Sequence, residues 1–88
     1  MAMKVINKPI EMISYHTTAG EITPLRFRMI DGDDTCVIKV NHVLDQAREK
    51  SLGREVVRFT CVSTVDGIEK RYELRFYPAN TLWKLYKM

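Results

Sequence analysis

The sequence predicts a mainly β fold, a small antiparallel and strongly bent sheet or partly open barrel of about six strands with one short helix. Two observations lead to this expectation: apolar and polar residues alternate along several segments, and turn signals separate those segments at short intervals. With 88 residues, of which 45% are apolar, the chain is expected to form a single domain over residues 1–88. Residues 1–4 are expected to be disordered or to derive from an expression vector.

The first half of the chain predicts three strands. Pro9 is expected to open the first strand, which ends near Tyr15, and the second strand covers Glu21–Ile30. Because proline cannot donate to a ladder, Pro24 marks a strand start, a bulge or an edge within the second strand. The third strand covers Thr35–Val40.

A hairpin is expected to join the second and third strands through the turn Asp31–Asp34. A four-residue turn places apolar residues opposite each other, and this agreement between turn and pattern sets the register. Cys36 and Cys61 each alternate in phase with apolar neighbours, so both are expected to be reduced and buried. The expected pairs are Met29–Cys36, Phe27–Ile38 and Leu25–Val40.

The segment Asn41–Leu52 predicts the helix. Asn41 is suited to cap its start, Val43 and Leu44 begin a short apolar stripe, and Gly53 is suited to end it.

A second hairpin is predicted from the strands Glu55–Val65 and Ile68–Tyr77, since Asp66-Gly67 is a favoured two-residue turn. A last strand is expected over Thr81–Met88, with Trp83 and Leu85 facing inward. The inner pairs of the hairpin are expected to be Cys61–Tyr72, Phe59–Leu74 and Val57–Phe76.

Four short motifs follow one another in the chain: Pro24-Leu25-Arg26-Phe27-Arg28, Val40-Asn41-His42-Val43-Leu44, Asp66-Gly67 leading into Tyr72-Glu73-Leu74, and Trp83-Lys84-Leu85. In this order they resemble a family of small uncharacterised bacterial β domains, over roughly residues 23–85. The chain departs from the family pattern at Met29 and Ala47, where members often carry tryptophan. The resemblance implies an accessory role around DNA repair and carries over no functional residues.

Several function classes lack their motifs. No apolar run approaches a membrane span, and no secretory signal opens the sequence, so a cytoplasmic protein without membrane contact is expected. The residues His16, His42, Cys36 and Cys61 are scattered singly, whereas a structural zinc site needs paired ligands at short spacings. No nucleophile, phosphate-loop or metalloprotease motif occurs. We therefore expect no catalysis, no cofactor and no metal.

The outer sides of the two hairpins carry the unusual features. The registers place Arg58 opposite Arg75 and Arg26 opposite Lys39, and like charges directly opposite each other are destabilising. Either Glu73 bridges the pair of arginines, or the basic residues form an anion-binding face on which single-stranded nucleic acid stacks. The residues expected to contact nucleic acid are Arg26, Arg28, Arg58, Arg71, Arg75 and Tyr77.

The same outer side is expected to hold an apolar patch, although the water-facing side of a sheet is usually more polar. Either the segment Asn41–Leu52 covers it, or a protein partner or second copy of the chain does. The expected interface residues are Val37, Val56, Val62 and Tyr77. The sequence thus favours a non-catalytic binding or accessory module that acts through protein–protein contact or homodimerisation, and weak binding of single-stranded nucleic acid is the alternative.

Overall fold

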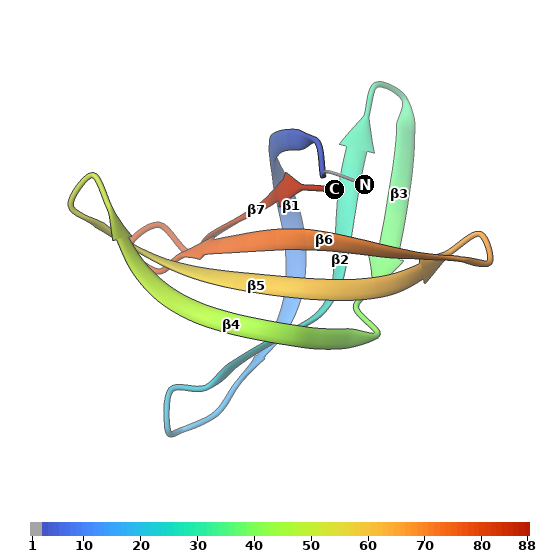
Figure 1. Cartoon of the computed structure of the whole chain (residues 1–88). Helices are drawn as coiled ribbons and strands as arrows, with labels where there is room; N and C mark the ends of the chain where they lie inside the picture. The colour runs from blue at the N-terminus through green and yellow to red at the C-terminus, as the bar shows by residue number, and fades with distance from the viewer. Residues whose placement is uncertain (1–2) are drawn as a thin grey trace.

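The fold is a single open sheet of seven antiparallel strands, seen in a computed structural model that describes residues 3–88 except for the side chain of Asp31. Its strand order is β3-β2-β1-β7-β6-β5-β4, so β3 and β4 are the two edges (Figure 1). The described residues contain no helix. The strands are β1 (Val5–His16), β2 (Ile22–Asp31), β3 (Asp34–Lys39), β4 (His42–Ser51), β5 (Arg54–Val65), β6 (Ile68–Tyr77) and β7 (Leu82–Lys87).

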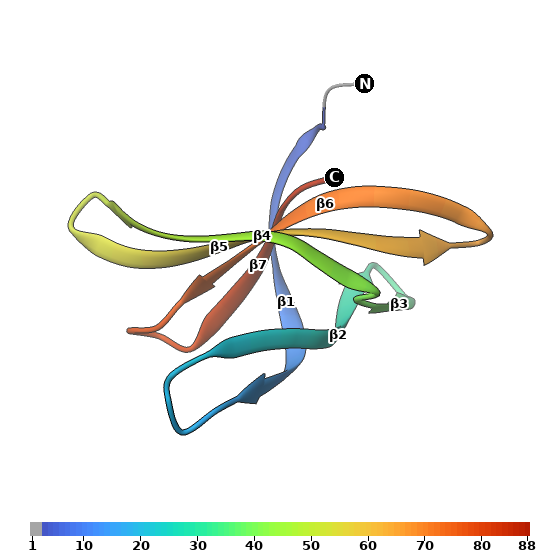
Figure 2. The ribbon, with the colours of Figure 1, turned by 60° about the horizontal axis from the view of Figure 1, so that its bottom comes forward.

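The strand β1 belongs to both halves of the sheet. Its first half, from Val5 to Ile10, pairs with β7, and its second half, from Glu11 to His16, pairs with β2. We call β1's second half with β2 and β3 the three-stranded limb, and its first half with β7, β6, β5 and β4 the five-stranded limb. The strands β4, β5 and β6 cross β1, β2 and β3 steeply, so the two limbs face each other (Figures 1 and 2).

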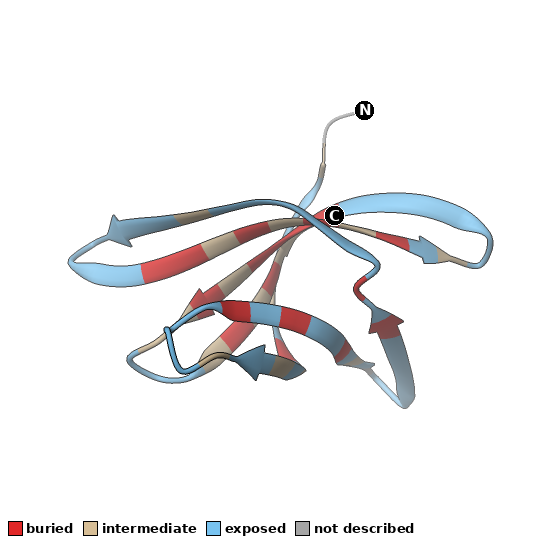
Figure 3. Cartoon of the chain, turned by 90° about the horizontal axis from the view of Figure 1, so that it is seen from below, coloured by how far each residue is buried: buried red, intermediate tan, exposed pale blue. Residues whose placement is uncertain are grey.

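The core lies between the limbs, and along most of the strands that contribute to it buried residues alternate with exposed or half-buried ones (Figure 3). Aromatic rings connect its two sides: Phe27 of the three-stranded limb meets Tyr72 of the five-stranded limb edge to face, with ring centroids 5.6 Å apart. The buried core residues are Ile10, Ile22, Phe27, Ile38, Val40, Val57, Phe59, Cys61, Tyr72, Leu74, Phe76, Trp83 and Leu85.

The predicted helix over Asn41–Leu52 is wrong, because this segment forms β4 and pairs with β5. Leu52 and Gly53 have φ angles of 52° and 79°, which make a two-residue hairpin turn rather than a helix end. The apolar stripe was too short to bury a helix. A strand at this place instead pairs the otherwise open edge of β5, so the sheet has seven strands rather than six.

The registers of both predicted hairpins are confirmed, since Phe27 pairs with Ile38 and Phe59 with Leu74. Asp66 and Gly67 form the expected turn, both with positive φ. The first turn is shorter than expected, because Asp31 pairs with Asp34.

Two inward positions of the first hairpin were predicted wrongly. Leu25 is exposed because Ile13 pairs with Arg26 but Ser14 with Pro24, which leaves Leu25 as an extra residue in a bulge. Of the three roles open to Pro24, the structure therefore assigns a bulge.

Cys36 is exposed, although Cys61 is buried as expected. The register places Cys36 two residues after Asp34, near the turn of the β2–β3 hairpin. This end of the hairpin projects away from β4, β5 and β6 (Figure 1).

The two ends of the described chain are paired. The N–H of Lys4 donates to the carbonyl of Met88 at 2.9 Å, and the N–H of Met88 donates back at 3.0 Å. The expectation of disorder therefore fails at Lys4, and for Met1 and Ala2 it lies outside the described residues.

A chain of buried hydroxyl groups joins the limbs where β3 leads into β4. The Ser63 hydroxyl donates to the carbonyl oxygen of Lys39 at 2.6 Å. The Tyr72 hydroxyl lies 2.5 Å from Ser63 Oγ, and because the Ser63 proton is given to Lys39, Tyr72 is the donor of this second bond. Beside this chain, Asn41 donates its N–H to the carbonyl of Val62 and accepts from the Thr64 N–H with its side chain. These bonds attach the β3–β4 connection to β5.

We expect Ser63→Ala to lower the free energy of unfolding by about 1–3 kcal/mol, because it leaves the Lys39 carbonyl and the Tyr72 hydroxyl without their shared partner. The double variant with Ser63→Ala and Tyr72→Phe should lose less stability than the sum of the two single variants, since Tyr72→Phe then removes a hydroxyl that has already lost its acceptor. Urea unfolding measures these effects, and Ser51→Ala at an exposed position is the matched control. Equal costs for Ser63→Ala and Ser51→Ala would show that the hydroxyl chain does not stabilise the fold.

Candidate functional site

The predicted site residues lie on two separate outer faces. Arg26, Arg28 and Val37 lie on the outer face of the three-stranded limb, where Arg28 pairs with Val37 and Arg26 with Lys39. The remaining predicted residues lie on the outer face of the five-stranded limb: Val56, Arg58, Val62, Arg71, Arg75 and Tyr77. The sequence therefore grouped residues that the bend of the sheet divides.

Acidic neighbours offset the facing arginines of the five-stranded limb. Arg58 and Arg75 are opposite each other, as predicted. Glu73 pairs with Arg75, its neighbour on β6, at 2.8 Å, so the expectation that it bridges to Arg58 is wrong. Arg58 instead pairs with Glu49 of β4 at 3.0 Å. With these two ion pairs, the like charges are neutralised by the sheet itself.

Cationic side chains also lie over tyrosine rings on this face. The guanidinium carbon of Arg75 lies 3.4 Å from the ring centroid of Tyr86, and the Lys84 ammonium lies 5.5 Å from that of Tyr77. Burial alone would lower the pKa of Arg75, but the hydrogen bond and charge of Glu73, with Tyr86 and Tyr77, raise this pKa above its ordinary value. A base that stacks on either ring must compete with the cation already there.

Two arginines of the predicted nucleic-acid set have no ion-pair partner among the side chains that the structure describes, Arg26 and Arg71, and both are exposed. A hollow of about 410 Å³ lies farther along the five-stranded limb. Arg54, Tyr77 and Lys84 are among the residues that line it. The free positive charge of this limb is therefore spread along its length rather than gathered around the Arg58–Arg75 pair.

The predicted apolar patch does not form one exposed surface. Val56 is only 2% exposed, so its expected role as an exposed contact residue is wrong. It pairs with Glu49 of β4, a strand whose place the sequence assigned to a helix. Val62 and Tyr77 are half-buried. Of the four residues, Val37 alone is exposed, at 59%.

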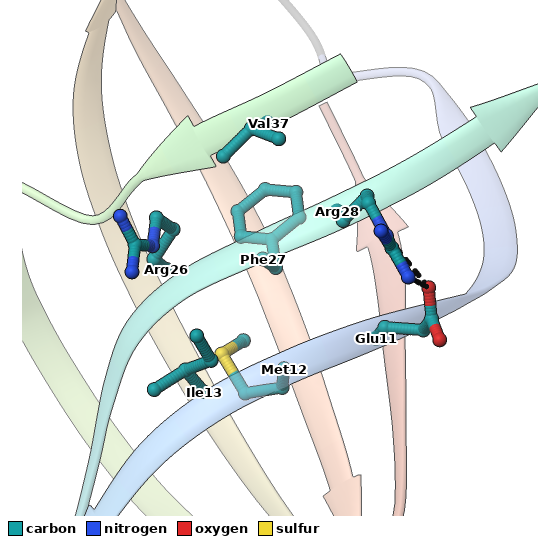
Figure 4. Close-up of a pocket in the computed structure, with 7 residues that line it drawn as sticks. All are labelled: Glu11, Met12, Ile13, Arg26, Phe27, Arg28 and Val37. Carbon is teal, nitrogen blue, oxygen red and sulfur yellow. Dashed lines mark hydrogen bonds and ion pairs between the residues drawn. The ribbon is translucent and has the colours of Figure 1, made fainter. Parts of the chain in front are cut away.

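Val37 borders a shallow groove of about 420 Å³ on the three-stranded limb (Figure 4). Ile13 stands across this groove and is 54% exposed. The ion pair of Arg28 with Glu11 closes one end, with Arg28 Nε donating to Glu11 Oε1 at 2.8 Å. The groove combines an apolar lining with a charged rim, as protein contact surfaces commonly do. Its lining residues are Glu11, Met12, Ile13, Arg26, Phe27, Arg28 and Val37.

The two edge strands differ in how they are protected. The edge strand β4 carries charged residues along most of its length, from Asp45 to Lys50, and has a bulge at Leu44. Charges and bulges are the usual means of preventing edge-to-edge pairing. The edge strand β3 has neither: the four residues Thr35–Ile38 are uncharged, and its charged residues stand only at its ends. The groove thus lies beside the unprotected edge of the sheet.

Sequence reasoning missed Glu11, Ile13 and Glu49. The first two lie in the first predicted strand, and their role appears only when that strand is paired with β2, which places Glu11 opposite Arg28 and Ile13 opposite Arg26. Glu49 was assigned to the helix. A strand reading of the same segment would have placed it near Arg58.

Nucleophilic and metal-binding groups are isolated. Burial raises the pKa of the Cys61 thiol to about 12, so this cysteine stays protonated. Ser14 Oγ lies 2.8 Å from His16 Nε2, but both residues sit at the surface and no described side chain orients the other ring nitrogen. Among the residues whose side chains the structure describes, no group of three or more His, Cys, Asp or Glu lies close enough together to hold a metal ion. No helix capable of crossing a membrane occurs among these residues.

We expect stability to fall as the pH rises from 9 to 12, in part through Cys61. Below its ordinary pKa of 9.0 the thiol is protonated in both the folded and the unfolded chain. Above that value the unfolded chain releases the proton, while the folded chain holds it up to about 12 and loses stability accordingly. Burial raises the pKa of Tyr72 to about 12 as well, with the same sign.

Urea unfolding at pH values below 9 and between 9 and 12 measures this loss. Cys61→Val should show a shallower decline than the unchanged protein, because one of the two buried acids is gone. A decline of identical slope would contradict the burial of the thiol.

Comparison with models of known protein families, with curated proteins and with solved structures found no match. The resemblance to small bacterial β domains therefore stays a prediction, and a function has to be inferred from the geometry of the two faces.

Proposed function

We propose that this chain is a non-catalytic protein-interaction module that associates with a second copy of itself through β3 and the groove beside it. One observation carries the proposal: Val37 is exposed in the uncharged stretch Thr35–Ile38 of an edge strand and borders a groove with an apolar lining. Exposed apolar side chains beside an unpaired strand edge favour association with another chain. The ionic contacts that cover the outer face of the five-stranded limb leave this side as the better contact surface.

The association should depend on apolar contact at Val37. Light scattering from micromolar to millimolar protein should give a mass that rises from monomer toward dimer, and the rise should persist at high salt. Val37→Asp should keep the protein monomeric, because a carboxylate loses its hydration at the contact. Ile68→Asp, at a similarly exposed position on the β5–β6 hairpin, is the matched control and should dimerise normally. A monomer mass at every concentration would contradict the proposal.

A second candidate function, weak contact with single-stranded nucleic acid, draws its support from Arg71 and from the cations Arg54 and Lys84 beside Tyr77. Phosphate contacts of this kind lose affinity steeply as salt rises. The arginines that face each other contribute less, because Glu49 and Glu73 already pair with them.

For this candidate we expect Arg71→Glu to weaken binding of a fluorescein-labelled single-stranded oligonucleotide severalfold, measured by fluorescence anisotropy at low salt. Arg58→Glu is the comparison, and it should have a smaller effect because its charge is offset by Glu49. Unchanged affinity in both variants, or an affinity that does not respond to salt, would rule out this face as a phosphate-binding surface.

A further inference from the structure

The open side of β3 presents backbone groups that can be assigned to residues. The N–H of Val40, just past the end of the strand, donates to the carbonyl of Leu25 at 2.9 Å. Hydrogen-bonded and non-hydrogen-bonded pairs alternate along an antiparallel ladder, so Ile38 and Cys36 also bond to β2. The backbone groups that point away from β2 therefore belong to Thr35, Val37 and Lys39.

One of these groups is already occupied. The Lys39 carbonyl accepts the Ser63 hydroxyl at 2.6 Å, which also shows that this carbonyl points away from β2. The edge is therefore covered by β5 at its Lys39 end and open over Thr35 and Val37. In each of these two residues, one N–H and one carbonyl lack a strand partner, since β3 pairs only with β2 in the sheet of residues 3–88.

We infer that this open stretch pairs, antiparallel, with the same stretch of a second copy, and that Cys36 of the two copies meets at the two-fold axis. This inference rests on the proposed self-association and specifies its geometry. A two-fold axis perpendicular to the sheet keeps each side chain on its own face, so residues opposite each other differ in number by an even count. With Cys36 opposite Cys36, Thr35 lies opposite Val37 in both directions, and every open backbone group of the two residues finds a partner.

Charge supports the same register. It places Asp33 of one copy level with Lys39 of the other, just beyond the open stretch at both ends of the contact, where the two exposed side chains can meet although the Lys39 carbonyl is bonded to Ser63. Opposite charges across a strand pair are favourable by a few tenths of a kcal/mol or more, so each end of the contact attracts. Between these ends the facing residues are uncharged, apart from Asp34, which lies opposite Ile38.

Moving the axis to Val37 is less favourable. That register needs the carbonyl of Lys39 as an acceptor for Thr35 of the second copy, and Ser63 already donates to it. The hydroxyl chain that joins the limbs thus also selects the register of the dimer.

Cys36 supplies a direct test of this geometry. Facing residues at a non-hydrogen-bonded position have Cα atoms about 4.5 Å apart, within the range that a disulfide spans. Diamide should link two copies through Cys36, as two thiols lose two protons and two electrons to the diazene bond and one S–S bond forms. Cys61 is buried and should not react. We expect a dimer band on a non-reducing gel that disappears on reduction and is absent in Cys36→Ser.

The matched control moves the thiol to the other edge. In a chain with Cys36→Ser and Gln46→Cys, the thiol is also exposed on an edge strand, but one whose charged residues oppose pairing. It should cross-link at least severalfold more slowly than Cys36. Equal rates would mean that random collision forms the disulfide, and this result would overturn the inference.

Charge exchange at the axis tests the register in the absence of a disulfide. Cys36→Lys and Cys36→Glu each place like charges opposite each other, so each variant alone should give a monomer mass in light scattering. An equal mixture should recover the dimer, because lysine then faces glutamate. Far-UV circular dichroism and thermal unfolding confirm that both variants fold.

The outcomes separate the two proposals. If the unchanged protein dimerises but the mixture of variants stays monomeric, the register at Cys36 is wrong while self-association stands. If the unchanged protein is monomeric throughout and diamide yields no dimer, both proposals are wrong.

Discussion

The hydrogen bond from Ser63 to the Lys39 carbonyl is the contact on which the rest of the structure depends. The two limbs share β1 at one side, and at the opposite side the sheet is open between β3 and β4. Apolar packing holds the limbs together but does not set how closely the end of β3 approaches β5. Ser63, with Tyr72 behind it, fixes that distance through hydrogen bonds that require the correct geometry. The same contact satisfies a carbonyl that would otherwise lie open at the edge.

The two outer faces differ in their ion pairs and in their exposed apolar side chains. On the five-stranded limb, arginines pair with glutamates of the same strand or of the neighbouring strand, and tyrosine rings lie beside the cations. The pair of Arg58 with Glu49 is exposed enough to add little stability, whereas Glu73 is buried beside Arg75; both pairs reduce the repulsion between arginines that the register places opposite each other. On the three-stranded limb, one such pair closes the end of an apolar groove and leaves Ile13 and Val37 in water.

The two hairpins were predictable because their registers follow from local pattern and turn chemistry, both of which lie within about twenty residues of chain. The segment that forms β4 was not, since Gly53 ends a helix as readily as it turns a hairpin, and few apolar residues mark a face. Its strand identity depends on β5, which needs a neighbour. This error also affected the predicted site, because without β4 neither the partner of Arg58 nor the burial of Val56 could be predicted. The exposure of Cys36 likewise depends on where the second layer ends.

The pairing of β1 with β7 has a consequence for how the protein folds. Val5 pairs with Lys87, so the strand that both limbs share is completed by residues almost at the other end of the sequence. Contacts this distant along a chain close late, because the entropy of a large loop must be lost before they form. Hairpins such as β2–β3 and β5–β6 can form first, with the barrier set by docking them across β1. Until then Ile38 and the other inward residues of the β2–β3 hairpin meet no opposing limb, and such exposed apolar residues beside a strand edge favour aggregation.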